Sequence, residues 1–496
     1  MSATIATLPS GQVRLKCYNP RTGESLGELD CHSLEAVDQV LENLRQAAAS
    51  YNRSAMSERV RLVRRFRKAL ARRLDDLVAT ICAETGKTQP EALLEIFGAL
   101  ELIRFGEREA GRTLRREYRP SGALLHKRGY VDYRPYGVAV IIAPWNYPFV
   151  LVVGPVVEAL LAGNAVVAKP SEYTSLSALL LKEIFDAATG RPELFSIVLG
   201  AGAVGQHLVS SPLSDIICFT GSSKVGAAVG QACAARLKPA ILELGGKDPM
   251  IVLDDANLSR AAKAAVWGGF TNAGQTCVAV ERVYVLASVY DRFLHMVRAE
   301  AQKLATDGQP SAVMGPVTVD SQVDRIKGHL RDAESKGARI ERFGSDNGRQ
   351  LPPAVITNVD HSMTIMTEET FGPELAIMSV ASEEEAIRQA NDSRFGLSAY
   401  IFTGSERRGR RVARQLACGS VAINDVIVQF GMASLPFGGW RNSGLGRLHG
   451  REGLLSFSQQ QAVVGSRVLL PAELWWYGMG ARSRGWMQRC MRWWYG

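Results

Sequence analysis

The sequence has few cysteines and histidines, and none is spaced as metal ligands or disulfide partners usually are. Its 496 residues include 8 cysteines and 7 histidines. No two cysteines form a C-x-x-C pair, and the histidines are scattered along the chain. These absences argue against a zinc site and against a disulfide framework. Because no secretory signal is recognisable at the N-terminus, we expect reduced thiols, no bound metal and a cytoplasmic location.

Signatures of nucleic-acid binding and of membrane spanning are also missing. The chain has no zinc-finger, RNP-like or helix-turn-helix pattern, and its net charge of +9 comes from acids and bases interspersed over most of its length. We therefore expect no nucleic-acid partner, although the positive charge favours anionic cofactors or membrane surfaces. The most apolar region, residues 138–168, is interrupted by prolines and polar residues. We expect buried strands and helices there, not a membrane span.

From residue 138 onward, the sequence alternates between short apolar runs, turns and helical patterns. Residues 138–142 form a continuous apolar run, which is typical of a strand buried on both faces. The same pattern recurs at residues 165–168, 195–199, 215–219 and 240–244. Strands that alternate with helices predict a parallel α/β sheet. The length of the chain allows two or three domains.

The part of the chain before this alternation is mainly helical. Ser33 is a good N-cap for a helix that begins at Leu34. Apolar residues at helical spacing predict further helices at residues 57–73, 74–84 and 89–111.

Cys277 is the candidate nucleophile. It follows a Gly-Gln-Thr loop after a helical segment at residues 261–269. A thiolate is the strongest nucleophile that a side chain offers near neutral pH. An isolated cysteine is more often a small buried apolar residue, so the interpretation depends on the other residues around it.

Glu243 and Asn146 are candidates for a base and for a hydrogen-bond donor. Glu243 ends an otherwise apolar strand, where burial costs free energy unless the carboxyl has a partner or a raised pKa. A general base is often made in this way, although exposure at the strand end is an alternative. Asn146 follows Pro144-Trp145, and a rigid loop with a side-chain amide suits an oxyanion-stabilising donor. An asparagine in a proline-rich turn is as often structural.

Two further strand ends carry residues suited to a nucleotide. Gly221 and Gly226 lie where a strand gives way to a helix, and glycine there lets backbone N–H groups approach a phosphate. The spacing is not G-x-G-x-x-G, so a simple tight turn is the alternative. Lys169 and Glu172 follow another strand and are suited to hydrogen-bonding ribose hydroxyls, or to forming a surface ion pair.

Taken together, these residues resemble the aldehyde dehydrogenase superfamily over nearly the whole chain. Seven motifs occur in the family's order: Pro-Trp-Asn at 144–146, Lys-Pro-Ser-Glu at 169–172, Phe-Thr-Gly-Ser at 219–222, Glu-Leu-Gly-Gly-Lys at 243–247, Gly-Gln-Thr-Cys at 274–277, Glu-Glu-Thr-Phe-Gly-Pro at 368–373 and Pro-Phe-Gly-Gly at 436–439. The Lys-Pro-Ser-Glu motif, Asn424-Asp425 and residues 442–450 look more like the class 3, or fatty-aldehyde, branch.

The resemblance implies NAD(P)-dependent oxidation of an aldehyde to a carboxylic acid. Cys277 would attack the carbonyl and pass through a thiohemiacetal and a thioester, while Asn146 and the cysteine N–H hold the oxyanion. Glu243 would activate the hydrolytic water. We favour a medium- or long-chain aliphatic or an aromatic aldehyde as substrate, with Tyr147 and Phe430 as candidate lining residues. The alternatives are a CoA-acylating relative, which the retained Glu243 disfavours, and a non-catalytic binding protein of the same fold.

The resemblance also implies the cofactor contacts. Lys169 and Glu172 would bind the adenosine ribose, and Glu369 with Phe371 would bind the nicotinamide ribose. The remaining residues assigned to the cofactor are Trp145, Gly221, Ser222 and Gly226. Glu172 should repel a 2′-phosphate, so NAD is the first choice and NADP remains open.

The family architecture implies an α/β fold with a Rossmann-type, parallel-sheet cofactor domain and an α/β catalytic domain. We expect the NAD(P)-binding domain at residues 1–118 and 138–243, rejoined at about 442–458, and the catalytic domain at 244–441. A β-arm at 119–137 and 459–470 would form a homodimer or tetramer.

The tail at residues 471–496 departs from this pattern because it is rich in tryptophan and arginine. It carries five of the eight tryptophans: Trp475, Trp476, Trp486, Trp493 and Trp494. At about 100° per residue, Trp486, Met491 and Trp494 share a helix face opposite Arg489 and Arg492. The tail is too short and too charged to span a bilayer, but it suits an interfacial helix. Class 3 relatives that handle long-chain aldehydes can carry membrane-directing extensions there. The alternative is a tail that packs on its own subunit or on a partner.

Overall fold

The computed structural model describes residues 4–7, 13–305, 313–473, 475–477 and 480–496. Small parts of the predicted ranges 1–118, 244–441 and 471–496 therefore lie outside the described residues. The chain forms two compact units. Unit 1 comprises Met1–Leu114 and Arg134–Gln459, and unit 2 comprises Arg115–Tyr133 and Gln460–Gly496.

The N-terminal part of unit 1 is a small antiparallel sheet followed by four helices. The sheet has the order β1 (Thr4–Thr7), β2 (Val13–Tyr18), β3 (Ser25–Asp30). The helices are α1 (Leu34–Tyr51), α2 (Met56–Arg72), α3 (Leu74–Thr85) and α4 (Gln89–Thr113). The predicted cap of α1 is present, because the Ser33 side chain accepts a hydrogen bond from the backbone N–H of Ala36. Thr88 and Glu91 form a capping box at the start of α4.

The first large sheet of unit 1 has the order β18-β10-β9-β6-β7-β8. Its parallel strands are β6 (Val138–Ile142), β7 (Ala165–Lys169), β8 (Phe195–Ile197), β9 (Ile216–Thr220) and β10 (Ala240–Glu243), and β18 (Gly444–Leu445) adds an antiparallel edge. The prediction of a parallel α/β sheet is confirmed. The strands lie within one or two residues of the predicted ranges, because runs buried on both faces are hydrophobic throughout.

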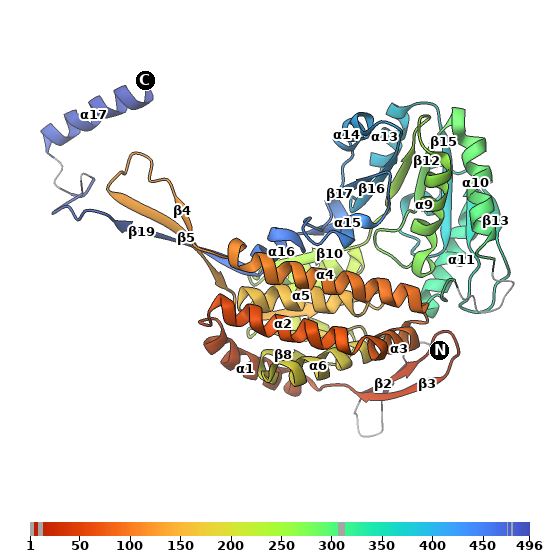
Figure 1. Cartoon of the computed structure of the whole chain (residues 1–496), viewed down its shortest axis with the longest axis horizontal. Coiled ribbons are helices and arrows are strands. Elements are labelled where there is room, and N and C mark those ends of the chain that lie inside the picture. Colours follow the sequence, from red (N-terminus) through yellow and green to blue (C-terminus); the bar gives the residue numbers. More distant parts are fainter. Residues whose placement is uncertain (1–3, 8–12, 306–312, 474, 478–479) are drawn as a thin grey trace. The chain divides into compact units, whose positions relative to one another are not determined.

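Helices cover both faces of this sheet. Side chains at alternate strand positions pack against α2, α3, α4, α5 (Val150–Ala162) and α6 (Leu176–Thr189) on one face. The other positions pack against α1, α7 (Gly202–Ser210) and α8 (Ser223–Ala234). Figure 1 shows α2, α4 and α5 side by side in the first of these layers. The carboxyl ends of the parallel strands are therefore free to meet loops at one edge of the sheet.

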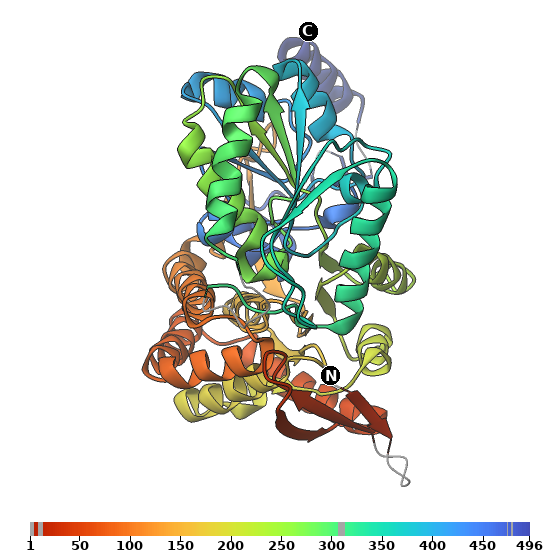
Figure 2. The same cartoon turned by 90° about the vertical axis from the view of Figure 1, so that its right-hand side faces the viewer.

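The second large sheet of unit 1 has the order β13-β14-β15-β12-β11-β16-β17. Its strands are β11 (Pro249–Val252), β12 (Arg282–Leu286), β13 (Arg339–Arg342), β14 (Ala354–Thr357), β15 (Glu374–Val380), β16 (Ser398–Phe402) and β17 (Ser420–Ile423), and β13 alone is antiparallel to its neighbour. Its helices are α9 (Leu258–Phe270), α10 (Tyr290–Gln302), α11 (Asp320–Ser335), α12 (Thr364–Thr367), α13 (Glu383–Asn391), α14 (Glu406–Ala413) and α15 (Val428–Gly431). Figure 2 shows the green and cyan helices around these strands. The chain then returns to the first sheet through β18 and α16 (Gly450–Ser456).

The described residues of unit 2 form a three-stranded sheet and one helix. The sheet has the order β19 (Ser458–Ser466), β5 (Lys127–Pro135), β4 (Glu117–Arg119). The helix predicted for the tail is present as α17 (Ala481–Tyr495), and Trp486, Met491, Trp493 and Trp494 are exposed on it. No helix among the described residues is long and apolar enough to cross a membrane. The predicted domain boundaries, the oligomerisation role of the arm and the membrane role of the tail stay predictions.

Candidate active site

The ends of three parallel strands meet at one cavity of unit 1. β6 leads into Trp145 and Asn146, β9 into Gly221 and Ser222, and β10 ends at Glu243. These residues line a cavity of about 190 Å³. Cys277, Glu369 and Phe371 line it from the second half of the chain. The structure thus brings together eight of the eleven residues that the sequence singled out, and five of the eight lie at or just after strand ends at one edge of the first sheet.

The other three predicted residues, Lys169, Glu172 and Gly226, do not line this cavity. The Lys169 Nζ lies 3.8 Å from a carboxylate oxygen of Glu172, and Lys169 is buried at the end of β7. Gly226 lies in α8, where an added Cβ would come within 2.2 Å of the Leu244 side chain. Glycine is therefore required there by the close packing of α8 against Leu244.

Cys277 is held by a loop with an unusual backbone. After α9, the residues Asn272, Ala273 and Gly274 have positive φ values of 52°, 54° and 72°. A Cβ on Gly274 would lie 1.9 Å from the carbonyl oxygen of Gly372, so only glycine fits this contact. The loop thereby packs its backbone directly against that of residues 371–373.

The surroundings of Cys277 disfavour ionisation of the thiol. Burial raises its pKa, and the carboxyl groups of Asp248, Glu243 and Glu369 raise it further. A thiolate at this position needs a nearby group that removes the proton, and Glu243 lines the same cavity.

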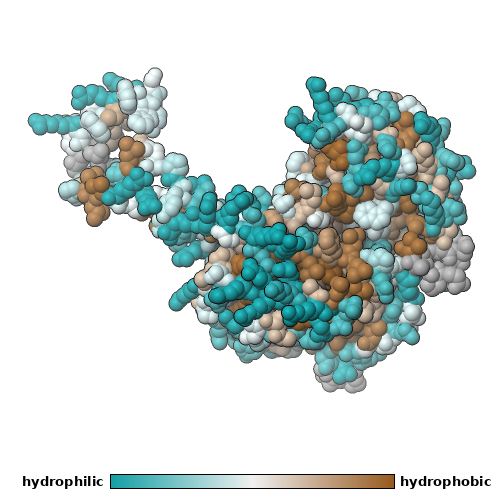
Figure 3. Space-filling model, viewed as in Figure 1, coloured by the Kyte–Doolittle hydropathy of each residue, from teal (hydrophilic) through white to brown (hydrophobic). Residues whose placement is uncertain are grey.

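A second cavity, of about 380 Å³, reaches Cys277 from another side. Its lining is mainly apolar: Leu94, Phe97, Gly98, Tyr147, Val150, Leu151, Trp267, Val278, Val426, Ile427, Val428, Phe430 and Met432, with Glu91, Glu95, Thr271, Thr276, Cys277, Asp425 and Gly431. Tyr147 and Phe430 are thus lining residues, as the sequence suggested. Leu94, Phe97 and Trp267 are also exposed to solvent at the outer part of this cavity. Figure 3 shows hydrophobic side chains gathered over this part of unit 1.

The two cavities share the residues around the thiol. Val150, Leu151, Cys277 and Phe430 line both of them. Glu243 lines only the cavity at the strand ends. A molecule in the apolar cavity and a molecule in the strand-end cavity can therefore both reach the sulfur, from different sides.

Glu243 is a buried carboxyl group without a fixed partner. It is 4% exposed, and neither carboxylate oxygen has a hydrogen-bond partner within the described part of the chain. Burial raises its pKa well above the usual value, Arg447 opposes this effect, and the nearby Glu158 adds to it. A carboxyl group with free oxygens at a cavity wall can bind a water molecule and accept its proton.

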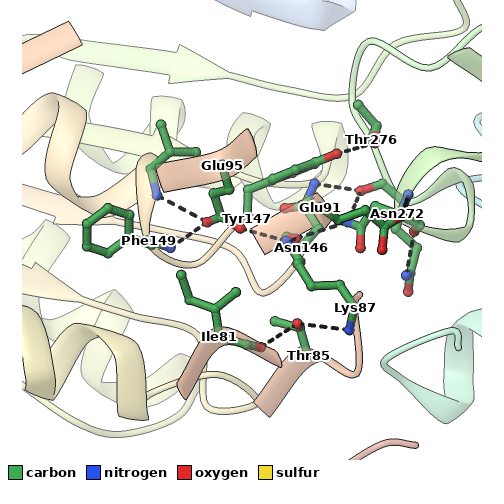
Figure 4. A network of polar contacts seen from close by, with 12 residues as sticks. Ile81, Thr85, Lys87, Glu91, Glu95, Asn146, Tyr147, Phe149, Asn272 and Thr276 are labelled. Atoms are coloured by element: carbon green, nitrogen blue, oxygen red, sulfur yellow. Dashed lines mark hydrogen bonds and ion pairs between the residues drawn. The ribbon is translucent and has the colours of Figure 1, made fainter. Parts of the chain in front are cut away.

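Asn146 is held through both its backbone and its side chain (Figure 4). Its side-chain Nδ2 donates to the carbonyl oxygen of Gln275 at 3.0 Å. Its carbonyl oxygen accepts from Lys87 Nζ at 2.9 Å and from Asn272 Nδ2 at 3.0 Å. An amide nitrogen carries two hydrogens, so Nδ2 retains one donor for a ligand in the cavity.

Lys87 and Glu95 form a buried ion pair that sequence reasoning missed. Their N–O distance is 2.6 Å, and both side chains are fully buried. The Glu95 Oε1 also accepts from the backbone N–H groups of Phe149 and Val150, at 2.9 and 3.2 Å. A signal was available, because Glu95 lies on the apolar face of its helix beside the buried Ile96.

Glu369 and Phe371 lie on a loop at the opposite wall of the strand-end cavity. Glu369 accepts a hydrogen bond from the N–H of Gly246 at 3.1 Å. Burial and the neighbouring Glu281 raise its pKa to about 7, and the Gly246 hydrogen bond opposes them. The ring of Phe371 meets Trp145 edge to face, with centroids 5.6 Å apart.

A second buried Lys–Glu pair holds this loop. Lys247 bonds to Glu281, and the Glu281 carboxylate accepts from the N–H groups of Thr370 and Phe371 at 2.9 and 3.1 Å. Phe371 has a φ of 59°, an uncommon value for a residue other than glycine. The hydrogen bonds to Glu281 compensate for this backbone conformation.

The fold and the site define a class: an α/β protein with a cysteine between a strand-end cavity and an apolar cavity. The sequence profile of the aldehyde dehydrogenase family matches residues 8–463. The chain is 40% identical over 470 residues to a 4,4'-diapolycopene aldehyde oxidase of Methylomonas sp, covering 94% of this chain and 88% of that protein. It is 33% identical over 460 residues to the human 4-trimethylaminobutyraldehyde dehydrogenase, covering 90% and 92%.

Solved structures agree with these relatives. A Mycobacterium tuberculosis aldehyde dehydrogenase complexed with NAD+ superposes with a TM-score of 0.87 at 32% identity, covering 93% of this chain and 95% of that one. A putative aldehyde dehydrogenase of Anabaena variabilis gives a TM-score of 0.88 at 33% identity, covering 94% and 100%. The chain belongs to the aldehyde dehydrogenase family and is an NAD(P)-dependent oxidoreductase.

Proposed function

We propose that this enzyme oxidises long apolar aldehydes to carboxylic acids, using Cys277 as the nucleophile. The observation that carries the proposal is the position of Cys277 between an apolar cavity and the cavity that holds Glu243. The name of the Methylomonas relative, a 4,4'-diapolycopene aldehyde oxidase, supports an extended apolar substrate. The motifs shared with the fatty-aldehyde branch support the same class, and we infer that the chain belongs near that branch.

The charges of the apolar cavity argue against small anionic substrates. A Mycolicibacterium smegmatis relative, 37% identical over 457 residues that cover 90% of this chain and 88% of that protein, is named a putative succinate-semialdehyde dehydrogenase. Among the described residues, no lysine or arginine lines the apolar cavity to bind a substrate carboxylate. Its three acidic lining residues already have partners: Glu91 with Thr88, Glu95 with Lys87, and Asp425 with Arg260. Apolar contact is therefore what this cavity offers.

The proposed chemistry proceeds in two stages on Cys277. Glu243 takes the proton of the Cys277 thiol and releases it to solvent, and the sulfur bonds to the aldehyde carbon. The resulting oxyanion accepts hydrogen bonds from Asn146 Nδ2 and the Cys277 N–H. NAD(P), when bound, supplies the hydride acceptor that converts this thiohemiacetal into a thioester. Glu243 then takes a proton from water as the water attacks the thioester carbon. The C–S bond breaks, the carboxylic acid leaves, and the sulfur takes the proton from Glu243 to restore the thiol.

The strand-end cavity has residues that fit NAD(P). Gly221 and Ser222 stand at the N-terminus of α8, where backbone N–H groups suit a pyrophosphate. Trp145, Glu369 and Phe371 would hold the nicotinamide end. We assign the adenosine ribose to Lys169 and Glu172, as the family resemblance implies. The carboxylate of Glu172 disfavours a 2′-phosphate, so we expect a preference for NAD. Gly226 contributes by letting α8 pack closely.

A substrate series tests the proposal. Purified protein should form NADH with aldehydes from short to long aliphatic chains and with aromatic aldehydes, and turnover should rise with chain length. NADP should be a poorer substitute, and added CoA should not be required. C277S should abolish turnover. Activity confined to short polar aldehydes would contradict the substrate class, and acyl-CoA formation would favour a CoA-acylating enzyme.

We further propose that unit 2 serves two purposes. The strands β5 and β19 would pair subunits into a homodimer or tetramer, which sedimentation can measure. The exposed tryptophans and arginines of α17 would bind a membrane surface. In a liposome flotation assay the full chain should float, and a version that ends at Leu470 should not. Equal behaviour of the two would contradict the membrane role.

A further inference from the structure

The start of helix α4 contacts both loops that frame the active-site cysteine. Glu91 Oε1 accepts from the N–H of Asn272 at 2.7 Å, on the loop that leads to Cys277. Lys87, just before the helix, donates to the carbonyl oxygen of Asn146. Figure 4 shows Lys87, Glu91 and Glu95 converging on these two loops. This short segment therefore joins residues that the two large sheets contribute separately.

A buried ion pair such as Lys87–Glu95 contributes little net stability to a protein interior. Moving two charges out of water costs free energy, and their mutual attraction often does no more than offset that cost. Apolar residues of similar volume would pack there without that cost. The other hydrogen bonds of the pair go to one loop: Lys87 donates to the carbonyl oxygen of Asn146, and Glu95 accepts from the N–H groups of Phe149 and Val150.

We propose that Lys87 and Glu95 are positioning residues that aim the Asn146 side chain at the oxyanion; this inference rests on the proposed function. The two ends of residues 146–150 are bonded to opposite members of one rigid pair. Lys87 Nζ also lies 4.2 Å from the ring centroid of Tyr147, which fills the turn between them. The hydrogen bond from Lys87 fixes the main chain of Asn146, and the hydrogen bond from Nδ2 to Gln275 fixes the plane of its side-chain amide. The second N–H of Nδ2 can therefore point in only one direction.

The positioning role differs from a merely structural one in its dependence on Asn146. If the pair acts through the Asn146 amide, breaking the pair has little effect once that amide is gone. If the pair only stabilises the fold, its loss lowers activity by the same factor with or without the amide. A double-mutant cycle on residues 87 and 146 separates the two cases.

The experiment measures kcat and KM for aldehyde oxidation in the full chain and in K87M, N146A and K87M/N146A. N146A removes one oxyanion donor and should lower kcat by about 100- to 1,000-fold. K87M misplaces that donor and should lower kcat by roughly 10- to 100-fold, with KM changed less than about threefold. In the N146A background, K87M should lower kcat by less than about threefold. Equal factors in both backgrounds would overturn the inference.

Two controls keep the test decisive. R67M breaks the ion pair of 2.6 Å between Arg67 and Glu107, which involves the same helix but not the site. It should leave kcat unchanged. K87Q keeps a donor for the Asn146 carbonyl and replaces K87M if K87M fails to fold; it should show a smaller loss of kcat and the same dependence on Asn146. An inactive wild-type protein would instead overturn the proposed function itself.

Discussion

If the apolar cavity binds the aldehyde chain as proposed, Gly98→Leu should remove the preference for long-chain aldehydes without harming the fold. Gly98 lies in α4 next to the lining residue Phe97 and itself lines the apolar cavity. A Cβ built at this position meets no atom within 4 Å. Since glycine disfavours helix, the replacement should stabilise α4 by about 1 kcal/mol. The leucine side chain would extend into open space at the cavity wall.

The expected effect on catalysis follows from the contacts that the leucine displaces. Exposed Leu94 and Phe97 place Gly98 in the outer part of the cavity, beyond the reach of a short aldehyde bound to Cys277. If a long chain loses about four buried methylenes, at about 0.8 kcal/mol each, it loses about 3 kcal/mol of binding. That corresponds to roughly a 200-fold lower kcat/KM for long aldehydes. For short aldehydes, kcat/KM should change less than about threefold.

The assay is NADH formation across an aliphatic aldehyde series with wild type, Gly98→Leu and Gly98→Ala. Gly98→Ala is the matched control, since it gains helix propensity and adds a single methyl group. The melting temperature of both variants should equal or exceed that of wild type. Unchanged long-chain oxidation, or an equal loss at every chain length, would refute the assignment of this cavity to the substrate.

Three further perturbations have defined outcomes. In stopped-flow measurements, Glu243→Gln should form one equivalent of NADH per site and then turn over at least about 100-fold more slowly than wild type. Steady turnover at the wild-type rate would exclude Glu243 as the base. Because the pKa of Glu243 is raised, the wild-type hydrolysis rate should fall as the pH drops through that raised pKa, and this limb should vanish in Glu243→Gln. Gly274→Ala should lower the free energy of unfolding by at least about 1–2 kcal/mol in urea denaturation, since φ is 72° and the Cβ would lie 1.9 Å from Gly372 O; an unchanged midpoint would contradict the contact. Burial raises the pKa of Glu158 from 4.5 to about 8, and the hydrogen bond from the His449 N–H opposes this effect. The folded state therefore favours the protonated carboxyl group, and the free energy of unfolding should fall as the pH rises from about 4.5 to about 8. Glu158→Gln should therefore raise the melting temperature more at about pH 9 than at about pH 5, and a pH-independent difference would count against this burial effect.

The first sheet and much of the site could be predicted from local sequence. Strands buried on both faces are apolar throughout, so their ends are easy to find in a sequence. Polar residues at those ends indicate the edge of the sheet at which a ligand binds. That reasoning brought Asn146, Gly221 and Glu243 together correctly. The family resemblance supplied Glu369 and Phe371, which no local pattern would have joined to Cys277.

The ion pairs behind the site could not be predicted in the same way. A lysine before a helix usually faces solvent, and although Glu95 lies on the apolar face of its helix, that position does not indicate which residue pairs with it. Their partners lie on loops more than fifty positions away. The apolar cavity has the same limitation, because α4, α9 and α15 each contribute a part of its wall.

The contacts of α4 also have a consequence for the order of folding. Lys87 bonds to a residue 59 positions along the chain, and Glu91 bonds to one 181 positions along. Closing loops of that length costs entropy, and contacts between residues close in sequence do not offset this cost. The long-range contacts of Lys87 and Glu91 therefore form late in folding. Helices and local strand pairs should therefore appear before the oxyanion geometry exists. During refolding, recovery of catalytic activity should lag behind recovery of the far-ultraviolet circular dichroism signal, and simultaneous recovery would show that the site assembles with the secondary structure.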